Sequence, residues 1–278
     1  MPATRVGFIG AGRMATALAR GLVQAEVVSS GEIVACDPSP VAAEQFKSAI
    51  PGATVLKNNR QLAAKAGVIV LAVKPQHMEL VLADLAGAVK GANGEVEDPL
   101  VVSIAAGVTL ARLSAGLPDG TRLVRVMPNT PCLIGRGASA YSLGATATAA
   151  DSDTVHQMLA AVGTAWEVPE KFLDAVTGLS GSGPAFVYTM IESLSDGGVL
   201  MGLPRDLASA LAAQTVAGAA EMVLTTGEHP AQLREEVTSP GGTTVAGLEA
   251  LEKEGLRAAL LQAVRAATCR SQELGGHH

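Results

Sequence analysis

The stretch Val6-Gly7-Phe8-Ile9-Gly10-Ala11-Gly12-Arg13-Met14-Ala15 decides the fold. Its first four residues form a short apolar run that predicts a buried strand, and a helical stretch follows to about Ala25. Between them, Gly10-x-Gly12-x-x-Ala15 matches the glycine-rich turn of dinucleotide-binding domains. Gly10 permits the tight turn, and Gly12 lets a diphosphate approach the backbone at the start of the helix. Taken alone, the motif is equally consistent with an ordinary strand–helix turn.

The pattern around this stretch favours an α/β domain. Short apolar runs of strand length recur at residues 33–36, 68–73, 100–104 and 123–127, and helices are predicted at 40–49 and 110–115. Runs that are apolar throughout are typical of parallel strands buried on both faces. The alternation therefore predicts a doubly wound parallel sheet. Two last short strands are predicted at 139–142 and 165–168.

The second half of the chain has a different character. After residue 168 the strand signals stop, and the chain is rich in alanine and predicted to be helical. We therefore expect two domains, residues 1–168 and residues 169–278. The segment 205–224 is apolar on nearly every side, and a domain of about 100 residues has little interior in which to bury several such helices. A homodimer formed through this half is the simplest explanation.

Composition excludes several classes of protein. The 278-residue chain has 48% apolar residues and 20 Lys and Arg against 26 Asp and Glu, a formal net charge of −6. These values exclude a disordered chain, and the lack of a dense basic run argues against nucleic-acid binding or an anionic membrane surface. No run approaches about 18 consecutive apolar residues, so we expect no membrane-spanning segment. The odd set Cys36, Cys132 and Cys269 contains no CxxC pair and predicts free thiols in a reducing compartment, most simply the cytoplasm.

Three peripheral stretches carry no part of the functional interpretation. Residues 1–5 run directly into the first strand, so we expect no secretory leader. Residues 91–99 are rich in glycine, asparagine and acids and predict a surface loop. The final Gly275-Gly276-His277-His278 resembles an appended tag.

The strand ends supply further candidates for a dinucleotide site. Asp37 ends the second strand run, where an acid binds the ribose hydroxyls in NAD sites. Its alternative role is to cap the helix that begins near Pro38. Small residues after the later strands, at 72–75, 103–107 and 127–131, leave room for a nicotinamide ring. Asn129 could hydrogen-bond the ring's carboxamide, and Lys74 either contacts a phosphate or stays solvated.

A second glycine-containing loop, Ser239-Pro240-Gly241-Gly242-Thr243-Thr244, precedes a helix predicted at 245–252. Its free backbone N–H groups would suit a small anion such as a carboxylate. The alternative is a capped loop, with Thr243 or Thr244 as the helix N-cap. The glycine-rich turn at 179–184 lacks the spacing of a hydrolase nucleophile elbow, which favours a packing role. His77, His156 and His229 lack metal-ligand spacing, so we expect no metal site.

Several of these motifs together resemble one family, the Δ1-pyrroline-5-carboxylate reductases. The resemblance runs from the opening glycine turn to the last helix. Its most specific parts are Asp174-Ala175-Val176-Thr177-Gly178-Leu179-Ser180-Gly181-Ser182-Gly183-Pro184-Ala185 and Val237-Thr238-Ser239-Pro240-Gly241-Gly242-Thr243-Thr244. Ala72-Val73-Lys74-Pro75 and Met127-Pro128-Asn129-Thr130-Pro131 also fit the family.

The resemblance implies reduction of 1-pyrroline-5-carboxylate to L-proline by NADPH or NADH, the last step of proline biosynthesis. It implies an N-terminal Rossmann domain and a C-terminal all-helical domain that binds substrate and forms dimers, which often assemble into larger rings such as a decamer. The residues that it assigns to the substrate carboxylate are Ser239, Gly241, Gly242 and Thr243, with the Thr244 hydroxyl near the ring nitrogen in a catalytic role. The cofactor residues are Ile9, Gly10, Ala11, Gly12, Arg13, Met14, Asp37, Asn59, Ala72, Val73, Lys74, Pro75, Ala105, Ala106 and Gly107, to which the strand-end argument adds Asn129.

One position departs from many relatives. An acid at Asp37 would repel a 2′-phosphate, so we expect NADH to be used at least as well as NADPH, with Arg13 as the residue that could offset the repulsion. Two other functions compete with the reductase. A β-hydroxyacid dehydrogenase would need a lysine early in the second domain, and residues 178–206 contain none. A non-catalytic dinucleotide sensor or scaffold would not need the loop from Ser239 to Thr244.

Overall fold

The computed structural model describes residues 5–89 and 98–276. The chain divides into two compact units, one comprising residues up to 182 together with those from 266 onward, the other residues 183–265. These compact units differ from the two domains predicted from sequence in two ways: the first unit extends to residue 182, and it also includes the end of the last helix. The functional division at residue 168 stays a prediction. The surface loop predicted at 91–99 lies almost wholly outside the described residues, as do residues 1–4 and 277–278.

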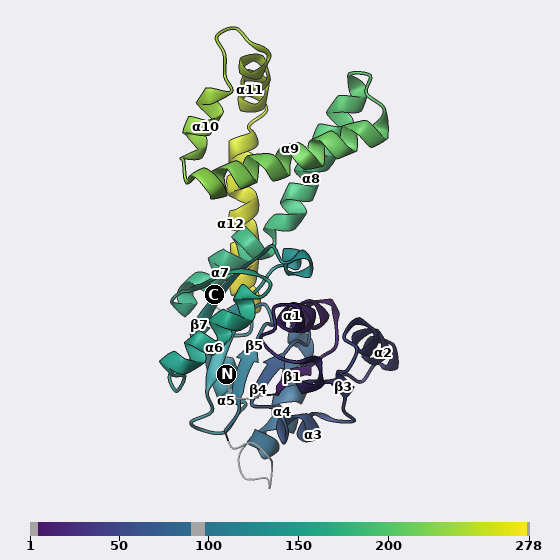
Figure 1. Ribbon diagram of the computed structural model, residues 1–278. Coiled ribbons are helices and arrows are strands. Elements are labelled where there is room, and N and C mark those ends of the chain that lie inside the picture. Colours follow the sequence, from purple (N-terminus) through teal and green to yellow (C-terminus); the bar gives the residue numbers. More distant parts are fainter. Residues whose placement is uncertain (1–4, 90–97, 277–278) are drawn as a thin grey trace. The chain divides into compact units, whose positions relative to one another are not determined.

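The first unit is built on an eight-stranded sheet of order β3-β2-β1-β4-β5-β6-β7-β8 (Figure 1). All neighbouring strands are parallel except β6 and β7, which are antiparallel. The doubly wound sheet is thus confirmed, with an antiparallel pair that sequence did not predict. The strands are β1 (Val6–Ile9), β2 (Ile33–Cys36), β3 (Thr54–Val55), β4 (Val68–Leu71), β5 (Leu100–Ser103), β6 (Leu123–Met127), β7 (Gly137–Leu143) and β8 (Gly163–Glu167).

Both faces of the sheet are buried, as the uninterrupted apolar runs require. Alternate residues of one strand enter different cores: Phe8 and Val70 pack on one face, while Ile9 and Leu71 pack on the other. The first face is covered by α1 (Arg13–Gln24), α2 (Pro40–Ala49) and α6 (Ala149–Ala160). The second is covered by α3 (Asn59–Ala63), α4 (Met78–Val89) and α5 (Leu110–Ala115).

A continuous helical region replaces the tight turn expected at 179–184. The chain passes from α7 (Leu173–Val176) through a π-helical turn at Thr177–Gly181 into α8 (Gly183–Leu200). A Cβ on Gly181 would overlap the terminal methyl of Met127, so this glycine packs closely against a side chain of β6. The packing role predicted for these glycines is confirmed at this position, although the backbone conformation was wrong.

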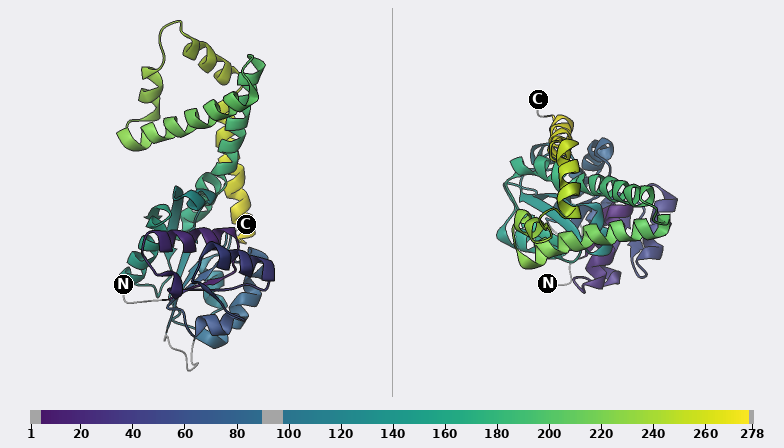
Figure 2. Two further views of the ribbon diagram at one scale, coloured as in Figure 1. Left: turned by 45° about the vertical axis from the view of Figure 1, so that its right-hand side comes forward. Right: turned by 90° about the horizontal axis from the view of Figure 1, so that it is seen from above.

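The second unit is helical. It contains α8, α9 (Arg205–Thr226), α10 (Pro230–Glu236), α11 (Thr243–Lys253) and the beginning of α12 (Leu256–Leu274). After a tight turn α9 diverges from α8 (Figure 2), and only Ala208 and Ala212 of α9 are buried. Large apolar side chains therefore remain exposed in the single chain, among them Leu211, Met222 and Leu224. An exposed apolar surface of this kind is typical of a subunit interface.

Helix α9 bears on the expectation that no segment spans a membrane. Among the described residues it is the one helix long and apolar enough to cross a membrane by length and composition, with a mean hydropathy of 1.4. The sequence criterion missed it because glutamine, threonine and glycine interrupt the apolar run without adding charge. The same properties suit a helix that a second subunit covers, so they are weak support for a membrane span.

Candidate functional site

The glycine turn after β1 has two glycines with different roles. Gly10 has φ +95°, its N–H donates to the Cys36 carbonyl at 2.8 Å, and a Cβ on it would lie 2.7 Å from the Ala72 carbonyl oxygen. Glycine is therefore required there by the fold itself. Gly12, the N-cap of α1, has φ −74°, and a Cβ on it would meet nothing within 4 Å. The open space at the helix N-terminus suits a bound diphosphate.

A cavity of about 590 Å³ opens at the carboxyl ends of β1, β2 and β4, beside this turn. Ligands of open α/β sheets bind at this edge. The predicted cofactor residues that line it are Ile9, Gly10, Gly12, Asp37, Asn59, Ala72, Val73 and Lys74. Sequence reasoning missed Cys36, Pro38, Lys57, Asn58, His77, Leu80, Val81 and Asp84, most of which come from the region of α3 and α4 that it left unassigned.

Eight predicted cofactor residues do not line this cavity: Ala11, Arg13, Met14, Pro75, Ala105, Ala106, Gly107 and Asn129. Met14 packs against one core and Ala105 belongs to the other. Their contacts with a cofactor stay predictions.

Asn129 has a clear structural role. Its amide Nδ2 donates to the Ser180 carbonyl at 3.1 Å, and its Oδ1 accepts from the Ala138 N–H at 2.9 Å. The side chain is buried and joins the end of β6 to β7 and to the π-helical turn. Both ends of its amide therefore already serve the fold, which leaves one amide hydrogen and one oxygen lone pair for the carboxamide contact predicted from sequence.

Asp37 is held rigidly at the edge of the cavity. Its Oδ2 accepts from the Ala11 N–H and its Oδ1 from the Ser39 N–H, each at 2.8 Å. One carboxylate thus joins the glycine turn to the start of α2, while Ser39 serves as the helix N-cap. The alternative in which Asp37 itself caps α2 is therefore wrong, and its carboxylate lines the cavity.

Charge around the cavity is mixed. Asp37 and Asp84 line it together with Lys57 and Lys74. Burial, followed by the negative charges of Asp37 and Asp84, raises the pKa of the Cys36 thiol. The thiol is therefore kept protonated at neutral pH, which disfavours it as a nucleophile.

The Ser239–Thr244 loop lies in the second unit, at the start of α11. Gly241 has φ +68°, and the Gly242 N–H donates to the Ser239 carbonyl at 3.1 Å. Gly242 is the N-cap of α11 and no side chain caps the helix, so the alternative with a threonine N-cap is wrong. Thr243 and Thr244 are the first two residues of α11, and their N–H groups have no partner within the helix.

The three histidines singled out in the sequence lie in different surroundings. His229 caps α10 by accepting from the Ala231 N–H at 3.2 Å, and His156 packs edge-on against Tyr141. His77 lines the cavity. Within residues 5–89 and 98–276 there is no cluster of three or more potential metal ligands.

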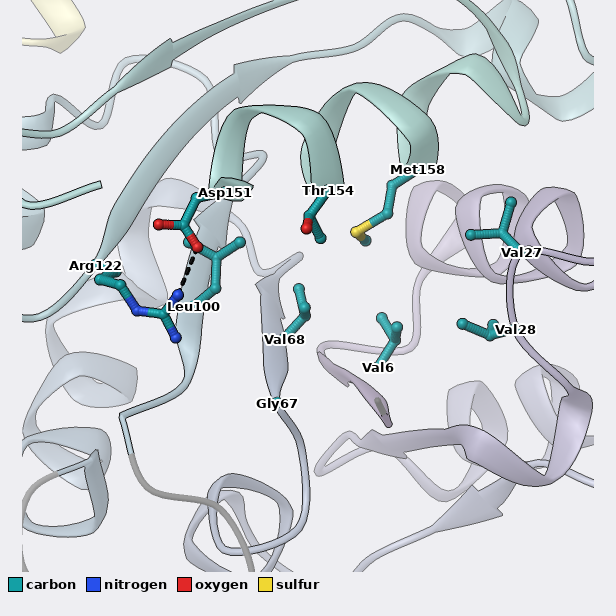
Figure 3. A pocket seen from close by; sticks show the side chains of 10 residues that line it. All are labelled: Val6, Val27, Val28, Gly67, Val68, Leu100, Arg122, Asp151, Thr154 and Met158. Carbon is teal, nitrogen blue, oxygen red and sulfur yellow. Dashed lines mark hydrogen bonds and ion pairs between the residues drawn. The ribbon is translucent and has the colours of Figure 1, made fainter. Parts of the chain in front are cut away.

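A second, smaller cavity of about 210 Å³ lies at the opposite edge, where β1, β4 and β5 begin (Figure 3). Val6, Val68 and Leu100 supply much of its wall, and the Arg122–Asp151 ion pair of 2.6 Å lies at one side. Asp151 also accepts from Thr148 in the capping box of α6, and Arg122 contacts Asp98 at 3.3 Å. These charges already serve the fold, so the cavity at the carboxyl edge is the better candidate for function.

Comparison with known proteins places this geometry in a family. Residues 170–274 match the family model "Pyrroline-5-carboxylate reductase dimerisation", and residues 5–107 match "NADP oxidoreductase coenzyme F420-dependent". Pyrroline-5-carboxylate reductases of Pisum sativum and a Synechocystis species are each 46% identical to this chain, over 97% and 98% of it and 95% and 98% of their own lengths.

Solved structures agree with the sequence relatives. Plasmodium falciparum pyrroline carboxylate reductase with NADP bound has a TM-score of 0.88 at 33% identity, covering 99% of both chains. The Coxiella burnetii pyrroline-5-carboxylate reductase has the same TM-score at 35% identity, covering 98% of both. The Rossmann-like domain and the C-terminal dimerisation domain are thereby confirmed, and with them a homo-oligomer and an NAD(P)-dependent oxidoreductase. The chain belongs to the pyrroline-5-carboxylate reductase family.

Proposed function

We propose that this protein reduces 1-pyrroline-5-carboxylate to L-proline with NADPH or NADH, the last step of proline biosynthesis. The observation that carries the proposal is that one chain, 46% identical to a pyrroline-5-carboxylate reductase over 97% of its length, has both an open glycine turn at Gly12 and an uncapped helix start at Gly242. A purified sample should consume NAD(P)H, seen as a fall in nicotinamide absorbance, when 1-pyrroline-5-carboxylate is added. Consumption with a β-hydroxyacid and NAD(P)⁺ instead, or binding without turnover, would favour the competing functions.

The mechanism requires little covalent chemistry from the chain. Bound NAD(P)H supplies the hydride, and a protonated cyclic imine is already electrophilic. The turn from Gly10 to Gly12 and the start of α1 would bind the diphosphate. The N–H groups at the start of α11 would bind the substrate carboxylate and so fix which face of the ring is presented. The Thr244 hydroxyl would stabilise the ring nitrogen as it becomes an amine.

The role of Thr244 gives a direct prediction. Thr244→Ala should lower kcat/KM for 1-pyrroline-5-carboxylate about 10- to 100-fold, since a hydrogen bond at the reacting nitrogen is lost. Steady-state kinetics at saturating NAD(P)H measure this, and Thr244→Ser, which keeps the hydroxyl, is the matched control. Full activity of the alanine variant would remove Thr244 from the mechanism.

Asp37 leads us to propose that NADH is used at least as well as NADPH. Two backbone N–H groups anchor its carboxylate, so it cannot easily turn away from a 2′-phosphate. Lys57 lines the same cavity and Arg13 does not, so Lys57 replaces Arg13 as the better candidate for offsetting this repulsion.

One substitution should shift the cofactor preference from NADH toward NADPH. Asp37→Ser should raise kcat/KM for NADPH relative to NADH at least about tenfold, because a negative charge beside the 2′-phosphate is removed. Parallel assays with both cofactors, before and after the change, give the ratio. A strong NADPH preference in the unaltered protein would contradict the proposed role of Asp37.

We also propose that dimers assemble into a larger ring such as a decamer, and that the protein works in the cytoplasm. The exposed apolar side chains of α9 support a large subunit interface. Cys36, Cys132 and Cys269 are free thiols, two of them buried, which suits a reducing compartment. Sedimentation velocity would give the assembly size, and a dimer alone would rule out the ring; cell fractionation would test the compartment.

A further inference from the structure

A buried network of charges links three distant parts of the first unit. Arg125 of β6 is 3% exposed, and its Nη1 donates to Glu170 Oε1 at 3.0 Å while its Nη2 lies 3.4 Å from Asp174 Oδ1. The Ser271 hydroxyl donates to the same Asp174 oxygen at 2.7 Å. Asp174 precedes the π-helical turn and Ser271 lies in the last turn of α12, so Arg125 joins β6 to α7, and Asp174 in turn joins α7 to α12.

The same network holds both sides of the loop after β5. On one side Glu170 Oε1 also accepts from the N–H of Leu110, the first residue of α5, at 2.7 Å. On the other side the end of α12 lies against the loop: Gly107 has φ +71°, and a Cβ on it would be 3.1 Å from Leu274 Cβ. The segment from Ala105 to Thr109 is therefore held at its exit by Glu170, and at Gly107 it lies against the helix turn that contains Ser271.

The position of this loop matters for the cavity. Strand β5 pairs with β4, and the Ile104 N–H donates to the Leu71 carbonyl at 3.1 Å. The next residues of the β4 side, Ala72 and Val73, line the cavity. A shift of the loop after β5 would therefore move the backbone of Ala105, Ala106 and Gly107. It would also disturb the segment beside Ala72 and Val73, which line the cavity.

We propose that Arg125, Glu170, Asp174 and Ser271 are positioning residues for dinucleotide binding, which act by holding the Ala105–Gly107 loop in place. The proposal rests on the cofactor role of that loop under the proposed function. None of the four residues lines the cavity, so they act through the backbone that they fix. Because the contacts run through α12, the C-terminal turn of the chain becomes part of the dinucleotide site's support.

The test distinguishes a specific effect on dinucleotide binding from a general loss of protein stability. Ser271→Ala removes one hydrogen bond to a buried carboxylate, and Glu170→Ala removes the acceptor at the exit of the loop. Val155→Ala is the matched control, since Val155 is a buried α6 residue on the other side of the sheet from α5. For each variant, Tm and the Kd for NADH and NADPH are measured by calorimetry and nicotinamide fluorescence, in the whole protein without substrate.

We expect Ser271→Ala and Glu170→Ala each to raise the dinucleotide Kd about fivefold, as part of a charge-assisted contact is lost. In turnover assays KM for NAD(P)H should rise while KM for 1-pyrroline-5-carboxylate stays unchanged. Val155→Ala should lower Tm by at least as much as the two network variants do, and should leave the dinucleotide Kd unchanged. An unchanged Kd in both network variants, or an equal rise in Val155→Ala, would overturn the proposal. Absence of imine reduction in the unaltered protein would instead refute the proposed function, because the Kd comparison does not need turnover.

Discussion

Replacing Arg125 with leucine is expected to lower the free energy of unfolding by about 3–5 kcal/mol, the usual cost of removing one partner from a buried ion pair. The Arg125 side chain is 4% exposed and pairs with Glu170 and Asp174. Without it, the buried Asp174 carboxylate would lose its charged partner and retain the hydrogen bond from the Ser271 hydroxyl. Urea unfolding followed by circular dichroism, at constant protein concentration so that oligomer dissociation is held fixed, measures the change.

A second arginine provides the matched control for Arg125→Leu. Arg112 pairs with Glu79 at 2.9 Å, but its side chain is 39% exposed and that of Glu79 is 81% exposed. Such surface pairs contribute about 0–1 kcal/mol, so Arg112→Leu should change stability little. If Arg125→Leu and Arg112→Leu lowered the free energy of unfolding equally, then burial would not explain how much the Arg125 network contributes to stability. The double variant Arg125→Leu with Asp174→Leu should recover part of the loss, since no unpaired buried charge is left at position 174.

The sheet and its glycine turn could be predicted because their determinants are local in sequence. The helices at 40–49 and 110–115 were predicted with the bounds that the structure has, and each begins at a serine or threonine N-cap. The strand runs were recognisable because both faces of each central strand are buried, so every residue of β4 is apolar. Gly10 and Gly12 could be identified because both belong to one short motif directly after β1, although the fold requires glycine only at Gly10, with its φ of +95° and the Ala72 carbonyl nearby.

Contacts between distant residues could not be predicted in the same way. Ser271 and Asp174 are 97 residues apart, and neither residue type indicates a buried partner. Asn129 was assigned to the cofactor because it follows a strand, but its amide joins Ser180 and Ala138. The antiparallel pairing of β6 with β7 depends on where the chain turns at 130–134, which strand propensity does not encode. The cavity residues of α4 were missed because no element was predicted from the sequence at 78–89, and the glycine motif does not reach this region.

Gly12→Val is expected to weaken NADH and NADPH binding at least about 100-fold while leaving the fold intact. The physical reason is that a valine side chain would occupy the space before the N-terminus of α1, where the diphosphate must approach the backbone N–H groups. The protein itself can accept the change, because a Cβ at this position meets nothing within 4 Å and φ −74° with ψ −177° is ordinary extended backbone. Fluorescence titration with each dinucleotide, together with a thermal unfolding curve, gives both quantities.

Gly10→Ala separates this ligand effect from a fold effect at the neighbouring glycine. At φ +95°, with a Cβ 2.7 Å from the Ala72 carbonyl oxygen, alanine must shift the backbone, and we expect a loss of about 1–3 kcal/mol in stability besides weaker binding. The two variants should therefore differ in Tm but agree in the loss of dinucleotide affinity. If Gly12→Val binds NADH and NADPH as the unaltered protein does, then the diphosphate does not lie at the start of α1, and the assignment of this cavity to the cofactor fails with it.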